Sequence, residues 1–387
     1  MVDFIHIKGN YEEMGLQQGQ QLKTKIKGMI DYVFHSEMIT AVKPRLVPLF
    51  LLKFGLGILG RFRIKKAIQK YLPNQYDKMM GIAKGAKLSK NFTYGMHFAE
   101  IYSGNPKTTA YIPQGCTMLF ALPPATIDNS FLFARNYDFP NVLQAYQMVR
   151  IDEPDDKIKT ICVSQYCIAG NHMGMNEKGL AIGINYARTW EKYPDDFRFK
   201  GVPSTLIVQE ALENYETTEE AIEFVSTFPA RANAIYFGIM DKSGDACVVE
   251  TTCKRFAIRR PEDGIMAHSN TFRTEELSDV NVPDRFHWKI KKMRHVPYIK
   301  SPKMRYDRAF ELLSKFKGNI GIETIKEILS DHYNKEIEDQ ETGDDYTICS
   351  HGETGSTLAS IIARPQTGQF FVTDNRPCQS IYEEFKI

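Results

Sequence analysis

The pattern of hydrophobic residues changes at Cys116, and this change constrains the fold more than any other feature. Before it, apolar residues recur at helical spacing, as in Ile26, Met29, Ile30 and Val33, so we expect mainly helices. After it come short runs rich in β-formers, separated by turn residues. These runs predict strands at 117–122, 130–134, 159–164, 179–185, 234–240 and 246–250.

Helical stretches lie between the strand groups, and one of them carries a capping-box pattern at Thr217 and Glu220. Helices are predicted at 204–228, 307–316 and 322–332, and further strands at 357–363 and 369–373. Hairpin-length turns join neighbouring strands, which favours antiparallel sheets. We therefore expect a layered α+β fold, with the helical head and the β-rich body in one domain.

Composition excludes several classes of protein. The 387 residues are 43% hydrophobic and 25% charged, which is typical of a globular chain and not of a disordered one. A net charge of +2 with scattered basic residues does not favour nucleic-acid binding. The seven cysteines are odd in number and lack the paired spacings of a zinc site, so we expect a reducing compartment and no metal. No secretory signal is visible, so a cytoplasmic location is expected.

The segment 46–66 is apolar as far as Gly60 and then basic. Pro48 and Lys53 interrupt the apolar run, which is too short to span a bilayer. We expect a buried helix hairpin here. The alternative is a basic amphipathic surface that touches a membrane or an acyl chain.

Two charged residues are expected to flank Cys116. A strand that leaves Cys116 and turns near residues 128–129 would return beside it and carry Arg135 and Asp138. Since these two are three residues apart, a regular strand points them to opposite faces, and a bulge or strand end is needed for both to face the thiol. A nearby guanidinium group favours thiolate, whereas a buried structural cysteine beside a plain ion pair is the alternative.

Two asparagines are further candidates. Asn185 ends a predicted strand, where its amide can donate to an oxyanion. Asn270 follows His268 in a short polar run, and Arg305 and Arg308 lie in another, but each of these patterns is weak alone.

Several motifs occur together in one order and resemble a known family. They are the step GCT at 115–117, RNYDF at 135–139, NEKGL at 176–180, HSN at 268–270 and NRPC at 375–378. Together they resemble the cysteine N-terminal-nucleophile hydrolases, specifically the isopenicillin-N acyltransferase-like family, which includes acyl-CoA:6-aminopenicillanic acid acyltransferase. Choloylglycine hydrolases and penicillin V acylases are related to that family. The resemblance covers most of the chain after Gly115.

This resemblance implies a four-layer αββα sandwich and self-cleavage between Gly115 and Cys116. Residues 1–115 would form one subunit and 116–387 the other. Cys116 would then be the nucleophile and its new α-amine the base. Such an amine titrates near ~7.7–8.0, so it accepts a proton around neutrality.

The resemblance also implies roles for the other residues. Arg135 and Asp138 match a pair that holds the thiolate and the amine. Asn185, or Tyr186 beside it, matches a position near the oxyanion. Asn270 matches an asparagine that binds the oxyanion and the terminal amine. A distal arginine corresponds to Arg305 or to Arg308, with Arg305 preferred. The chemistry requires no cofactor.

The expected activity is hydrolysis of a linear amide in a small N-acyl substrate through a Cys116 thioester. The main alternative is acyl transfer from acyl-CoA by the same nucleophile. Another enzyme hypothesis is an uncleaved papain-like site with His268, His351 or His172 as base. A non-enzyme hypothesis is a membrane-associated binding protein that uses 46–66. Homo-oligomer formation stays open.

Overall fold

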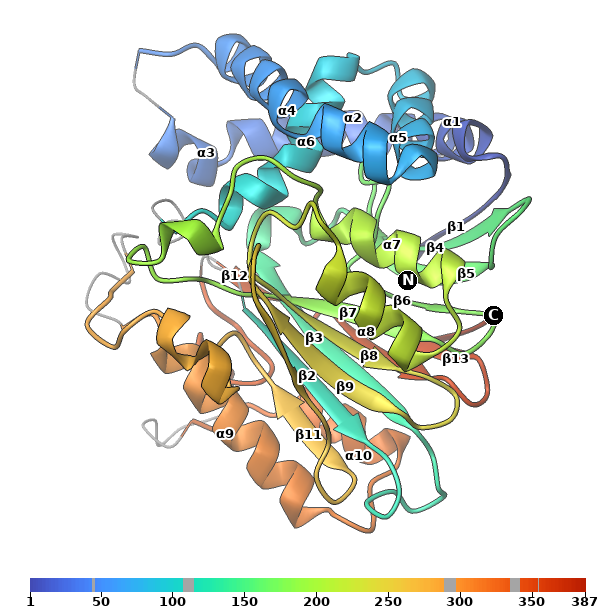
Figure 1. The fold of residues 1–387 in the computed structure, drawn as a ribbon, viewed down its shortest axis with the longest axis vertical. Helices are drawn as coiled ribbons and strands as arrows, with labels where there is room; N and C mark the ends of the chain where they lie inside the picture. Colours follow the sequence, from blue (N-terminus) through green and yellow to red (C-terminus); the bar gives the residue numbers. More distant parts are fainter. Residues whose placement is uncertain (44–45, 107–114, 289–296, 335–341, 354) are drawn as a thin grey trace.

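The computed structural model describes the chain except for residues 44–45, 107–114, 289–296, 335–341 and 354. The described residues before Gly115 form one strand and a group of helices: β1 Asp3–Gly9, α1 Tyr11–Gln21, α2 Lys23–His35, α3 Glu37–Val42, α4 Leu49–Tyr71, α5 Pro73–Gly85 and α6 Lys90–Ser103. Figure 1 shows helices α2 to α6 gathered at one end of the molecule.

Most of the strands follow Gly115. They are β2 Gly115–Ala121, β3 Leu132–Pro140, β4 Gln147–Pro154, β5 Thr160–Gln165, β6 Met173–Asn176, β7 Ala181–Tyr186, β8 Ile235–Met240, β9 Ala246–Thr251, β10 Phe256–Arg259, β11 Ile265–His268, β12 Gly355–Arg364, β13 Gln369–Val372 and β14 Glu383–Lys386. The later helices are α7 Ser204–Asn214, α8 Thr218–Thr227, α9 Lys300–Lys315 and α10 Ile322–Leu329. The capping box predicted from Thr217 and Glu220 begins α8.

The strands form two sheets that pack face to face. One sheet has the order β1-β4-β5-β6-β7-β8-β9-β10 and the other the order β11-β2-β3-β12-β13-β14. Phe120 and Phe133 of the second sheet stack with ring centroids 4.4 Å apart and share a core cluster with Ile161 and Tyr236 of the first. The hydrophobic core therefore fills the space between the sheets.

Helices cover the outer face of each sheet. Leu312 of α9 and Ile328 of α10 pack with Leu119 and Ala134 of the second sheet. Helices α7 and α8 lie over the first sheet, as Figure 1 shows. The layer order is helix, sheet, sheet, helix, which confirms the predicted αββα arrangement.

The N-terminal part is less purely helical than expected. β1 pairs in parallel with β4, with Ile5 opposite Arg150 and Ile7 opposite Asp152. Its residues alternate between buried and exposed, which is the pattern of a half-buried edge strand. Residues before the Gly115–Cys116 bond thus contribute a strand to a sheet that is otherwise built from residues after it.

A buried group of charges holds α5 against the first sheet. Lys78 of α5 donates to Asp152 of β4 at 2.7 Å, and Arg150 Nε donates to the same carboxylate at 2.8 Å. All three side chains are fully buried. The two cations lower the pKa of Asp152 and oppose the rise that burial alone would cause. The helical head is therefore fixed to the sheet by paired charges as well as by apolar contacts.

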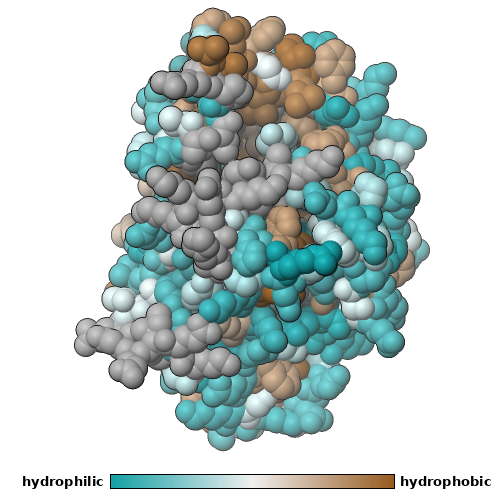
Figure 2. Space-filling model, turned by 90° about the vertical axis from the view of Figure 1, so that its left-hand side faces the viewer, coloured by the Kyte–Doolittle hydropathy of each residue, from teal (hydrophilic) through white to brown (hydrophobic). Residues whose placement is uncertain are grey.

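The prediction of a buried hairpin at 46–66 is wrong. Residues 49–71 form one helix, α4, and large apolar side chains on it are exposed: Phe50 at 69%, Phe54 at 64% and Phe62 at 75%. Figure 2 shows hydrophobic residues gathered at the end of the molecule formed by the N-terminal helices. Across the described residues, no helix is long and apolar enough to cross a membrane. The apolar run ends at Gly60, whereas the helix continues through the basic residues to Tyr71, so hydropathy predicted neither the length of the helix nor which of its faces is covered.

We predict that Asp152→Asn lowers the free energy of unfolding by about 3–5 kcal/mol, because Lys78 and Arg150 then remain buried without their carboxylate. Urea denaturation followed by circular dichroism measures the change. The matched control is Glu153→Gln, the next residue, whose exposed pair with His6 is worth at most about 1 kcal/mol. Equal effects of the two substitutions would contradict the role given to the buried group.

Candidate active site

The β2–β3 hairpin places Cys116 between the two sheets. Cys116 lies opposite Tyr137 in the antiparallel register, and Gly115 lies opposite Asp138. The turn between the strands includes Asn129 in the left-handed region, at φ 54°. β3 continues well beyond the predicted 130–134, so residues 135 and 138 lie inside the strand and not at its end. The Cys116 side chain is fully buried in the intact chain.

Arg135 faces the sulfur from the inner side of β3. Its Nη2 donates to Cys116 Sγ at 3.0 Å, and its Nε donates to Asn185 Oδ1 at 3.2 Å. The guanidinium group also lies 4.8 Å from the centre of the Tyr137 ring. Asn185, from β7 of the opposite sheet, donates through Nδ2 to the Cys116 carbonyl at 3.4 Å. On the inner face of β3, the sulfur is therefore bound by the Arg135 guanidinium group, and Asn185 of the opposite sheet positions that group.

Asp138 faces the outer side of the same strand. Thr357 donates to Asp138 Oδ1 at 2.7 Å, while the buried Oδ2 has no hydrogen-bond partner in the described part of the chain. A Cβ atom on Gly115 would meet this Oδ2 at 3.0 Å. The bulge considered for β3 is not needed: Arg135 and Asp138 keep the alternation of a regular strand and reach Cys116 and its neighbour Gly115 from opposite faces. The register shift lies in the partner strand β12, between Thr357 and Ala359.

Arg305 of α9 reaches the backbone of Cys116. Its Nη1 donates to the Cys116 carbonyl at 2.6 Å and to Thr117 Oγ1 at 3.0 Å. Arg308, one turn later, pairs instead with Asp331 at 2.9 Å. Of the two arginines left open by the sequence, the structure brings Arg305 to the cluster, where its side chain is 1% exposed.

Asn270 binds the nitrogen of Cys116. Its Oδ1 accepts from Cys116 N at 2.9 Å and from Arg305 Nη2 at 2.8 Å, and its Nδ2 donates to the Tyr186 carbonyl at 2.8 Å. Two donors at one end and a carbonyl at the other fix the orientation of the amide. Tyr186 thus contributes its backbone oxygen to the site. The sequence suggested that Asn270 binds an oxyanion, but in this structure its side-chain nitrogen already donates to that backbone oxygen.

Burial and neighbouring charges act in opposite directions on the pKa values of Cys116 and Asp138. Burial raises the pKa of the Cys116 thiol, and the positive charge of Arg135 works against that rise. Burial likewise raises the pKa of Asp138, with Arg305 as the main opposing charge. In the intact chain the buried thiol is therefore held neutral, beside a cation that favours its thiolate.

None of the three histidines considered as a base has a recorded hydrogen bond or ring contact with Cys116 in the described structure. His268 pairs with Glu250 at 3.0 Å. His172 stacks on Tyr137 with centroids 4.6 Å apart, and burial lowers its pKa to about 3. His351 lies beside Cys349. This geometry does not support an uncleaved cysteine–histidine site.

Two contributors had no assigned role in the sequence. Thr117 directly follows Cys116 and accepts a hydrogen bond from Arg305. Its position in the GCT motif could have indicated that it belongs to the site. Thr357 holds Asp138 from a strand more than two hundred residues away, and nothing in the sequence indicates that contact.

Several solved structures share low similarity with this chain. An N-acylethanolamine-hydrolyzing acid amidase ortholog from Caenorhabditis elegans is 14% identical, with a TM-score of 0.45 over 70% of this chain and 100% of that chain. A variant of conjugated bile acid hydrolase from Clostridium perfringens is 14% identical, with a TM-score of 0.42 over 70% and 97%. Penicillin V acylase from Agrobacterium tumefaciens is 15% identical, with a TM-score of 0.43 over 70% and 86%.

Sequence comparison is more specific. Protein dcd1A of Dictyostelium discoideum is 25% identical over 245 residues, which are 57% of this chain and 52% of that protein. The chain thus spans about half the length of this curated relative. The family model described as acyl-coenzyme A:6-aminopenicillanic acid acyl-transferase matches residues 126–370. That match is well over half of the chain and includes every candidate site residue except Cys116, which lies ten residues before it. The chain belongs to the acyl-coenzyme A:6-aminopenicillanic acid acyl-transferase family.

Proposed function

We propose that this chain is a self-processing cysteine amidase that cleaves the bond between Gly115 and Cys116 and then hydrolyses a linear amide in an N-acyl substrate. One observation carries the proposal: separate buried groups bind the sulfur, the nitrogen and the carbonyl oxygen of Cys116. They are Arg135 for the sulfur, Asn270 for the nitrogen, and Arg305 with Asn185 for the oxygen. A structural cysteine does not need this set of contacts. Membership of an acyl-transferase family adds support.

In the processing step, Cys116 Sγ attacks the carbonyl carbon of Gly115. A carbon–sulfur bond forms, the peptide carbon–nitrogen bond breaks, and the nitrogen leaves with a proton as the α-amine. Water then hydrolyses the thioester to release the Gly115 carboxylate and the free thiol. Asp138 Oδ2, which lies beside Gly115 and has no hydrogen-bond partner among the described residues, is suited to hold the new ammonium group.

In turnover, the α-amine takes the thiol proton and the thiolate attacks the substrate carbonyl. The resulting ammonium returns a proton to the leaving amine as the carbon–nitrogen bond breaks. The amine then deprotonates a water molecule, which attacks the thioester and releases a carboxylic acid. Arg135 stabilises the thiolate at the beginning and at the end of this cycle.

Acyl transfer is the second candidate, and the description of the matched family favours it. It differs only in the group that attacks the thioester, an amine in place of water, and in the use of acyl-CoA as donor. Both activities share the Cys116 thioester. Assaying N-acyl amides of varied acyl length with and without acyl-CoA and an amine acceptor separates the two.

We predict that Cys116→Ala leaves the chain uncleaved and inactive, because the attacking atom is removed. Cys116→Ser should cleave slowly and turn over poorly. Mass spectrometry of the denatured chain measures cleavage, and amide hydrolysis measures turnover. Cys253→Ser is the matched control, since that cysteine donates to the Asp195 carbonyl and lies outside the site. Full activity in Cys116→Ala would rule out the proposed nucleophile.

We also predict that Arg305→Ala reduces processing and turnover by at least about 10- to 150-fold, because loss of its charge-assisted hydrogen bond to the Cys116 carbonyl alone is worth about 1.5–3 kcal/mol and its bonds to Thr117 and Asn270 are lost as well. Arg308→Ala is the control from the next turn of α9, and its rates should stay close to those of the parent chain. Circular dichroism establishes that both variants are folded. A larger loss of activity in Arg308→Ala than in Arg305→Ala would show that Arg308, and not Arg305, is the distal arginine of the site.

We further propose that α4 contacts an anionic lipid surface. Phe50, Phe54 and Phe62 recur at multiples of four residues, so they form one stripe along the helix. The exposed cations Arg61 and Lys66 stand at the C-terminal end of that stripe. This combination is typical of a helix that lies in a membrane interface.

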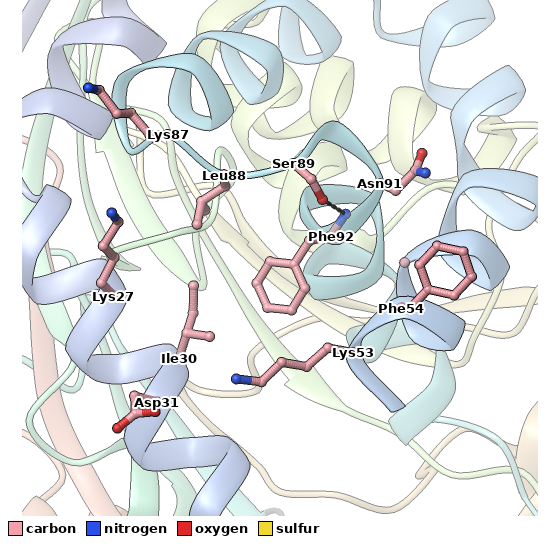
Figure 3. Close-up of a pocket in the computed structure, with 11 residues that line it drawn as sticks. Lys27, Ile30, Asp31, Lys53, Phe54, Lys87, Leu88, Ser89, Asn91 and Phe92 are labelled. Carbon is pink, nitrogen blue, oxygen red and sulfur yellow. Dashed lines mark hydrogen bonds between the residues drawn. The ribbon is translucent and has the colours of Figure 1, made fainter. Parts of the chain in front are cut away.

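A groove beside α4 adds to this surface. It has a volume of about 590 Å³ and lies between α2, α4 and the start of α6. Figure 3 shows Ile30, Leu88 and Phe92 on its walls, with the amine of Lys53 directed into it. Lys27 and Lys87 add two more cations to the lining, and Asp31 adds one carboxylate. Apolar walls with an excess of cations fit the glycerol and phosphate region of a lipid.

We predict that the protein co-sediments with phosphatidylcholine vesicles that contain phosphatidylserine, and less with phosphatidylcholine alone. Phe50→Asp with Phe54→Asp should weaken vesicle binding at least about a hundredfold, since each buried phenylalanine contributes about 1.5–3 kcal/mol. Ile127→Asp is the control, because Ile127 is 66% exposed but lies between β2 and β3. Unchanged binding in the double variant would refute the contact.

A further inference from the structure

Four metal-binding side chains meet at a place that the proposed reaction does not use. They are His332, which follows α10, Cys349 and His351, which precede β12, and Cys378, which follows β13. One ligand atom from each residue lies within 4.8 Å of all the others. Three separate segments of the chain thus bring two thiols and two imidazoles together.

Three distances in the group are within about 0.1 Å of the range expected around a tetrahedral ion. Cys349 Sγ and Cys378 Sγ are 3.5 Å apart, Cys349 Sγ and His351 Nε2 are 3.6 Å apart, and His351 Nε2 and Cys378 Sγ are 3.2 Å apart. Bonds of about 2.3 Å to sulfur and about 2.0–2.1 Å to nitrogen separate neighbouring ligand atoms by roughly 3.3–3.8 Å in a tetrahedron. A disulfide requires sulfurs about 2.05 Å apart.

The imidazole of His332 adds a buried nitrogen to this group. His332 Nε2 is buried and makes no hydrogen bond to any described residue. The His332 and His351 rings are perpendicular, with centroids 4.8 Å apart. A buried polar nitrogen without a partner is unfavourable, and a metal ion is a partner that imidazole accepts.

We propose that His332, Cys349, His351 and Cys378 bind one zinc ion. Two thiolates with two imidazoles are a ligand set that zinc prefers over magnesium, calcium or manganese. With four protein ligands the site is closed, so the ion has a structural role. Spacing alone did not reveal it, because the three segments meet only in the folded chain.

The ion would support the outer face of the active site. Ser350, between two of the ligands, donates its backbone N–H to Thr357 Oγ1 at 2.9 Å. Thr357 in turn donates to Asp138 Oδ1 at 2.7 Å. Asn136, two residues before Asp138, donates to the Ile348 carbonyl at 2.9 Å. Cys349 and His351 are thus positioning residues for Asp138, and this consequence, unlike the metal site itself, rests on the proposed function.

Elemental analysis of the full chain, expressed with zinc and purified under reducing conditions, tests the site. We expect one zinc ion per chain, retained after dialysis. Cys378→Ser should lose the zinc, and Cys253→Ser should keep it. Cys116→Ala should keep it too, so the metal content can be measured independently of activity. In parent protein loaded with cobalt, we expect the thiolate charge-transfer bands of a tetrahedral site.

A metal-free parent protein without cobalt bands would overturn the proposal. A Cys349–Cys378 disulfide, found by peptide mapping after rapid alkylation, would overturn it as well. If the site supports Asp138, zinc-free Cys378→Ser should process itself more slowly and show a shifted pH profile. Unchanged processing in a zinc-free, folded variant would refute the link to Asp138 and leave the zinc site standing.

Discussion

The site depends on two guanidinium groups that are buried on either side of one strand pair. Arg135 and Arg305 are almost completely buried, and Asp138 is the buried carboxylate next to them. The three together carry one net positive charge, which a Cys116 thiolate would neutralise. Burial makes the thiol a weaker acid, and the positive charge of Arg135 opposes this effect without cancelling it in the intact chain. Without the close packing of both arginines, Cys116 would be an ordinary buried cysteine.

The layered fold was largely predictable because short strands and turns leave local patterns. The hairpin of β2 and β3 follows from two β-rich runs separated by Asp128-Asn129, and the pairing then puts Arg135 near Cys116. β1 was missed although its alternation is visible, because the helices that follow dominate the N-terminal composition. The fate of α4 was not predictable from hydropathy, since the same apolar residues suit a core or an exposed surface.

The site was predictable only in part, for a geometric reason. Arg135 and Asp138 lie on the strand that pairs with Cys116, so a local argument finds them. Asn185 and Arg305 come from the opposite sheet and from an outer helix. Local patterns made them only weak candidates, and the family resemblance was needed to place them in the site. Thr357 and the side chains that meet around Cys349 were not predicted, because all of them except the neighbours Cys349 and His351 come from segments that meet only in the folded chain.

Successive side chains of β3 point to opposite faces of the strand, so Arg135 and Asp138 act on different parts of the site. Arg135, on the inner face, acts on the sulfur and is positioned by Asn185 from the opposite sheet. Asp138, on the outer face, lies beside Gly115 and is positioned through Thr357 by the segment that carries Cys349. The thiolate and the α-amine of a cleaved chain would therefore be controlled from different layers. The two layers are also connected through the Cys116 carbonyl, which accepts from Asn185 and Arg305, and through Asn270, which binds Arg305 and the Tyr186 carbonyl. Asp138 and Arg305 therefore act on the acidity of the thiol as well as on the amine.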